Sequence, residues 1–195
     1  MRSAGKHRTG RLSTIRCADM LKDIRTMIFM ALLVGLALAI SLFESVIPIP
    51  FVAPGAKLGL SNIVILVTLV VFGFRRALIV ACLKSVLLML VTGSVSSMFF
   101  SLAGALFATT VMGIAYFKVS RKVFSLIGVS ILGAVAHNFG QLSVAYIVMH
   151  NPYVYSYLPV LVLAGLFTGF FVGLSGRYVT ANLKQHFPQK EKKAL

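Results

Sequence analysis

Long apolar runs, separated by short polar or basic segments, dominate the chain. The runs are continuous rather than alternating, and they are about twice the ten-residue length of a strand in a membrane β-barrel. A helix needs about 20 apolar residues to cross a bilayer. The pattern therefore predicts an all-α membrane bundle with six spans, at about Thr26–Ile47, Leu58–Phe74, Ala77–Val91, Val95–Phe117, Phe124–Met149 and Val154–Leu174.

The composition supports a membrane protein. Hydrophobic residues make up 58% of the 195 residues and charged residues only 12%, and the mean hydropathy is +0.94. Soluble domains carry about twice that share of charge. We expect one transmembrane domain over residues 26–176, between basic tails at 1–25 and 177–195.

The positive charges lie on one side of the predicted bundle. The net charge is +15, and 17 of the 19 Lys and Arg residues fall in the two tails or in the second and fourth connections. Because cytoplasmic segments are enriched in Lys and Arg, this distribution predicts that both termini are cytoplasmic. We expect the basic N-terminal tail to face anionic lipid rather than nucleic acid.

The fifth predicted span holds a polar group within an apolar run. The segment Gly133–Gln141 contains His137, Asn138 and Gln141. His137 and Gln141 are four residues apart, so they lie on one face of a helix. In a bilayer such side chains face another helix or a cavity. Two interpretations stay open: these residues hold helices together, or they line a binding cavity.

Four more polar residues fall within or beside the predicted spans. Glu44 lies near the outer end of the first span, and Lys57 and Asn62 lie at the outer part of the second. Lys84 is about 12 Å into the third span at 1.5 Å per residue, where an ammonium group is costly and must face the interior. Two alternatives stay open for Lys57. Its side chain could extend to the lipid headgroups, or it could form an ion pair with Glu44.

Small residues recur every four positions in three spans. In the first span the stripe is Ala31, Gly35 and Ala39; in the fourth it runs from Ser97 to Gly113; in the sixth it is formed by glycines from Gly165 to Gly173. Such stripes let helices approach closely. The later two predict packing within the bundle. The first predicts either the same packing or a docking face for another subunit.

The polar residues of the spans predict a pocket open to the outside of the cell. Its lysines would suit an anionic or carbonyl-bearing ligand. The candidate substrate-binding residues are Glu44, Lys57, Asn62, Lys84, His137, Asn138 and Gln141. We expect no catalytic residue, metal site or cofactor. The acidic residues number only four, and no Walker motif or metal-ligand cluster is visible.

The chain resembles a known family through the first-span stripe and two motifs, Pro-Gly-Ala-Lys-Leu-Gly-Leu-Ser-Asn at 54–62 and Gly-Ala-Val-Ala-His-Asn-Phe-Gly-Gln at 133–141. Together with the six predicted spans, they are similar to the Gx transporter family, often labelled heptaprenyl diphosphate synthase component I. The resemblance covers about residues 27–175. It departs from the family pattern at Gly35, where an alanine is usual.

The resemblance implies a substrate-binding S-component of an energy-coupling-factor (ECF) importer in a prokaryotic cell membrane. Ala31, Gly35 and Ala39 would then dock on a transmembrane coupling subunit, which carries two ABC ATPases. The synthase label fits the residues poorly, because Asp19 and Asp23 lack the adjacent aspartate of a DDxxD motif. The alternative is a non-catalytic accessory protein of prenyl diphosphate or quinone synthesis, or of flavin-dependent redox proteins.

Overall fold

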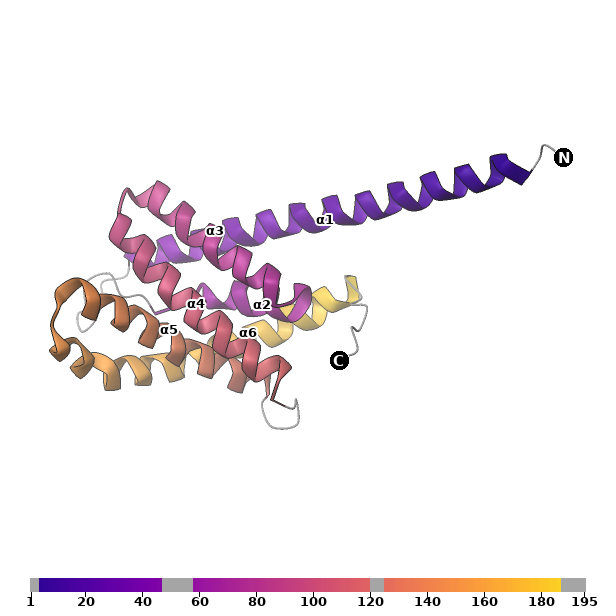
Figure 1. Ribbon diagram of the computed structural model, residues 1–195. Helices are drawn as coiled ribbons and strands as arrows, with labels where there is room; N and C mark the ends of the chain where they lie inside the picture. The colour runs from indigo at the N-terminus through magenta and orange to yellow at the C-terminus, as the bar shows by residue number, and fades with distance from the viewer. Residues whose placement is uncertain (1–3, 47–57, 120–124, 187–195) are drawn as a thin grey trace. The chain divides into compact units, whose positions relative to one another are not determined.

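The computed structural model describes residues 4–46, 58–119 and 125–186, and this part of the chain contains helices and no strand. The chain divides into two compact units, residues 1–33 and 34–195. The helices are α1 (Ala4–Val46), α2 (Asn62–Phe72), α3 (Phe74–Thr92), α4 (Val95–Phe117), α5 (Leu126–Met149), the short 3-10 helix η1 (Pro152–Tyr157) and α6 (Leu158–His186). Helices α2 to α6 run in alternating directions (Figure 1).

Glycine and serine residues set the helix boundaries. Gly73 alone separates α2 from α3, with a φ of 90°, and Gly93 ends α3 with a φ of 67°. Both conformations are strained for residues with a side chain. Ser94 and Ser125 then cap α4 and α5, each hydroxyl accepting a hydrogen bond from a backbone N–H three residues on. The short connections at Gly73 and at residues 93–94 keep α2, α3 and α4 antiparallel to their neighbours.

Three helices differ in length from the spans predicted for them. Helix α1 begins at Ala4, so most of the expected N-terminal tail is helical; the first proline, Pro48, comes only after this helix ends. Helix α2 begins at Asn62 rather than Leu58, because Gly59 adopts a φ of 81° in a turn. Helix α6 extends to His186, well beyond the predicted end at Leu174.

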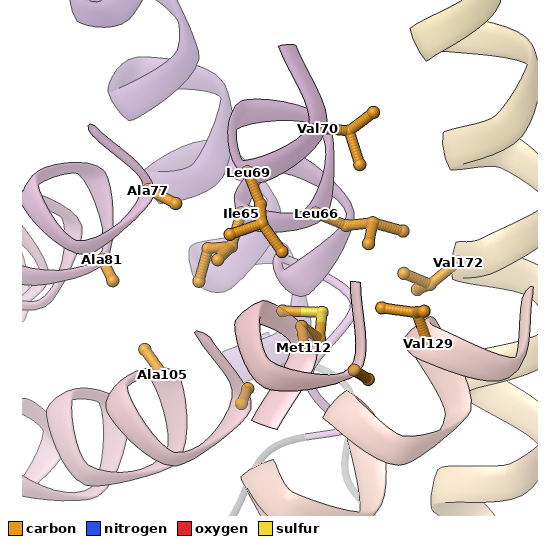
Figure 2. Packing of buried hydrophobic residues seen from close by; sticks show 12 residues of the cluster. Ile65, Leu66, Leu69, Val70, Ala77, Ala81, Ala105, Met112, Val129 and Val172 are labelled. Atoms are coloured by element: carbon orange, nitrogen blue, oxygen red, sulfur yellow. The ribbon is translucent and has the colours of Figure 1, made fainter. Parts of the chain in front are cut away.

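The hydrophobic core surrounds α2. Nine of the eleven residues of this helix are buried, as expected for a helix that is apolar on every side. Its residues Ile65, Leu66 and Leu69 pack with Met112 of α4 and with small residues of α3 and α4 (Figure 2). Val129 of α5 and Val172 of α6 complete the cluster. Helix α2 is therefore central in the unit of residues 34–195.

The glycine stripe of α6 packs directly on α5. A Cβ atom at Gly169 would lie 2.7 Å from Cα of Ile131, and one at Gly173 would lie 2.7 Å from Cα of Ile127. The stripe of α4 is also buried from Ser101 to Gly113. The predicted packing role of these two stripes is confirmed.

We expect Gly169→Ala to destabilise the bundle, because the new methyl group would meet the α5 backbone. Overpacking of this kind costs about 1–3 kcal/mol. Gly35→Ala is the matched control, since nothing lies within 4 Å of its Cβ position and alanine favours helix by up to about 1 kcal/mol. Melting temperatures in detergent measure both effects. Equal melting temperatures for the two variants would contradict the close α5–α6 packing.

The outer surface of the helices is apolar. Ile147, Leu163, Phe167 and Phe171 are each more than half exposed, which is unusual for a soluble monomer. Within the described residues, four segments are long and apolar enough to cross a membrane: Ile24–Val46, Val95–Phe117, Leu126–Met149 and Pro152–Gln185. Helix α2 has only 11 residues, and α3 carries Arg75, Arg76 and Lys84. The fold is that of a multi-pass helical membrane protein.

Candidate functional site

A group of polar side chains is buried where α2 begins. We call it the polar layer. Its seven side chains are each at most 4% exposed. They come from the end of α1, the turn before α2, the start of α2 and the middle of α3 and α5. The members are Glu44, Ser61, Asn62, Lys84, His137, Asn138 and Gln141.

The turn at residues 58–61 forms hydrogen bonds with both a carboxylate and an ammonium group. The backbone N–H of Leu60 donates to Oε1 of Glu44 at 2.6 Å. Nζ of Lys84 donates to Oγ of Ser61, the next residue, at 2.9 Å. Two buried opposite charges on one turn reduce the cost that either would have alone. Lys84 thus faces the interior, as its position in the sequence predicts.

His137 occupies a space that two glycines leave open. A Cβ atom at Gly104 of α4 would lie 2.7 Å from Cε1 of the ring, and one at Gly59 would lie 3.0 Å from Cδ2. Nε2 of His137 lies 2.8 Å from Nε2 of Gln141. In this arrangement the amide nitrogen donates and the ring nitrogen accepts. The pair on α5 is therefore oriented toward α4 and the 58–61 turn.

The side-chain amides of Asn62 and Asn138 differ in how many hydrogen bonds they form within the described residues. Nδ2 of Asn138 donates to the backbone carbonyl of Leu161 in α6 at 2.6 Å, while its Oδ1 accepts no hydrogen bond within the described residues. For Asn62, neither Nδ2 nor Oδ1 has a hydrogen-bond partner in that part of the chain. A buried amide without partners costs about 1–3 kcal/mol. Asn62 is thus the polar group of this layer most available to a ligand or a water molecule.

The other predicted residues are not tested by the structure. Lys57 falls outside the described residues, so its proposed ion pair with Glu44 stays a prediction. Ala31, Gly35 and Ala39 are exposed, and both interpretations of this stripe, internal packing and subunit docking, stay predictions. No group of three or more His, Cys, Asp or Glu residues that could hold a metal occurs in the described part of the chain.

The sequence did not indicate some of the hydrogen-bond partners of the buried polar side chains. Ser61 belongs to the motif at 54–62, but the sequence did not indicate that it is the partner of Lys84. Ser85 of α3 and Ser101 of α4 lie 3.1 Å apart through their hydroxyl oxygens. Ser101 stood in a recognisable small-residue stripe, but no local pattern pairs it with a residue 16 positions away.

A family model described as heptaprenyl diphosphate synthase component I matches residues 33–179. The match covers most of the chain and includes every residue of the polar layer. The chain belongs to the heptaprenyl diphosphate synthase component I family. No curated protein and no solved structure shows significant similarity to it. The polar layer is therefore a feature of a family member whose matched region consists of packed membrane-type helices.

Proposed function

We propose that this family member is the substrate-binding membrane subunit of an ECF-type importer, taking a small molecule from outside the cell. The observation that carries the proposal is the start of α2. The turn at 58–61 is irregular backbone within a membrane bundle, which is tolerated where it is buried in protein or lines a cavity. Interrupted helices of this kind often form substrate sites in transporters.

The chemistry of the polar layer supports a small-molecule site. Lys84 supplies a positive charge, His137 and Gln141 supply hydrogen-bonding groups, and Asn62 presents a donor and an acceptor that the described residues leave unused. Lys57 would add a second cation, and Glu44 would act as counter-charge. The substrate would then combine polar groups with an apolar body, as a vitamin, a flavin or a quinone precursor does.

The proposed orientation has six crossings and cytoplasmic termini. Arg75 at the start of α3, Lys118 directly after α4 and Arg177 in the last third of α6 are exposed. The α3–α4 connection at 93–94 carries no Lys or Arg. The positive-inside rule then puts the start of α2 toward the outer face. We propose no catalytic role for the chain; the ATPases of the importer would be separate subunits in a prokaryotic cell membrane.

The exposed stripe of α1 provides the test of docking. We expect Gly35→Leu to abolish recovery of the coupling subunit and uptake of the substrate, because a bulky side chain would separate the two helices. The small molecule that co-purifies with the protein should still be present. Cys82→Leu, at an exposed position of α3, is the control for added bulk. Normal substrate uptake by the Gly35→Leu variant would contradict the proposal that this stripe docks on the coupling subunit.

A second candidate is favoured by the family description itself, which names a synthase component. In this alternative the chain is a non-catalytic accessory protein that organises prenyl diphosphate or quinone synthesis, or flavin-dependent redox proteins, at the membrane. The exposed face of α1 would then bind one of those proteins. The identity of the partner chains separates the two candidates.

A further inference from the structure

A second site lies far along the bundle from the polar layer. The structure contains a cavity of about 270 Å³ where α2 and α4 end, α5 begins and the last turns of α6 pass by. This volume lies just below the lower limit of about 300 Å³ for drug-sized ligand pockets. It is suited to a head group rather than a whole cofactor. The lining residues are Val70, Ala115, Tyr116, Ser125, Leu126, Thr180 and Lys184.

The lining combines one cation with hydroxyl groups and an apolar wall. Lys184 supplies the ammonium group, and Tyr116 and Ser125 supply hydroxyl groups. Val70 and Leu126 form part of the apolar wall. Among the described residues that line the cavity, none is a carboxylate. The cavity therefore favours an anion attached to an apolar body.

The position of the cavity also suits an anion attached to an apolar body. Arg75 at the start of α3, Lys118 two residues after the lining residue Tyr116, and Arg177 three residues before the lining residue Thr180 are exposed. Such basic residues mark the level of the lipid headgroups on the cytoplasmic side. A phosphate at this level would reach Lys184, and an attached chain would lie along Val70 and Leu126 toward the apolar surface.

We propose that this cavity binds the phosphate head of an anionic amphiphile at the cytoplasmic face of the membrane. The phosphate group belongs either to a membrane lipid or to a free diphosphate compound. The site is separate from the polar layer, and it does not depend on the importer or on the accessory interpretation. If either of those two functions were disproved, the proposal for this cavity would still stand.

The test uses the full chain in nanodiscs of phosphatidylcholine. Native mass spectrometry would measure retention of added dioleoyl phosphatidic acid, and calorimetry would measure binding of inorganic diphosphate. We expect Lys184→Ala to weaken binding about tenfold, the effect of losing one charge-assisted hydrogen bond. Lys184→Arg should retain it. Lys118→Ala, at an exposed cation outside the cavity lining, should bind like the wild type.

The outcomes separate the two sources of phosphate. Binding of phosphatidic acid alone identifies a lipid site, and Lys184-dependent binding of inorganic diphosphate identifies a site for a free compound. Two results would overturn the proposal: neither probe binds the wild-type protein, or Lys184→Ala and Lys118→Ala reduce binding equally. The second result would mean that only the general surface charge attracts the probe. Lys184 is exposed, so the variants should fold, which circular dichroism would check.

Discussion

Replacing Asn62 by leucine should remove substrate binding while making the empty protein more stable. Both polar atoms of its side chain are buried without a hydrogen-bond partner in the described residues. Leucine has a similar size and no amide, so the variant is relieved of an unsatisfied group that costs about 1–3 kcal/mol. In the proposed function, the same amide binds the substrate. We therefore expect a raised melting temperature without ligand and at least tenfold weaker binding.

The matched control is Asn138→Leu. This residue is equally buried, but its amide nitrogen donates a hydrogen bond to the carbonyl of Leu161. Loss of this hydrogen bond should lower the melting temperature. Thermal unfolding in detergent and the amount of co-purified small molecule per protein measure both variants. A lower melting temperature for Asn62→Leu, equal to that of the control, would mean that the Asn62 amide stabilises the fold and is not held for a ligand.

Replacing Lys84 by methionine should cause the largest loss of stability. Methionine is close to lysine in length, so packing is retained. The variant loses the bond from Nζ to Ser61 and leaves the buried carboxylate of Glu44 without the cation on the same turn. Breaking a buried charge pair costs about 3–5 kcal/mol, and we expect a cost of this order because both charges bond the 58–61 turn. For a chain of this size, that corresponds to a melting temperature roughly 10 °C lower.

A double-variant cycle tests whether the two charges act together. Glu44→Gln removes the carboxylate charge, so we expect Glu44→Gln combined with Lys84→Met to be more stable than the sum of the single losses predicts. Additive losses would show that the two charges do not interact through the 58–61 turn. A melting temperature of Lys84→Met equal to that of the wild type would mean that Lys84 is not held in the interior.

The sequence was sufficient to predict the helices and several of their contacts. Apolar runs located α4 and α5 within about two residues, and the glycine stripe of α6 correctly indicated a close approach of another helix. These features are local, because a helical period places small residues on one face whatever the partner is. The inward orientation of Lys84 was also predictable, since a cation at that depth has no favourable alternative.

Other features depend on tertiary structure. The start of α2 at Asn62 follows from the left-handed conformation of Gly59, and this conformation places Leu60 and Ser61 on Glu44 and Lys84. No local pattern gives such a pairing between residues 16 and 23 positions apart. The continuation of α6 past Leu174 was missed because its serine, glycine and arginine residues are typical of a helix end.

The most direct test of the proposed function is the identity of the proteins bound to the chain. The tagged protein would be purified from its native membranes in mild detergent, and its partners would be identified by mass spectrometry, with Gly35→Leu as the control for the exposed α1 face. The importer account predicts a transmembrane coupling subunit and two ABC ATPases, all lost in the Gly35 variant. Recovery of prenyl transferase or redox proteins without ATPases would contradict it.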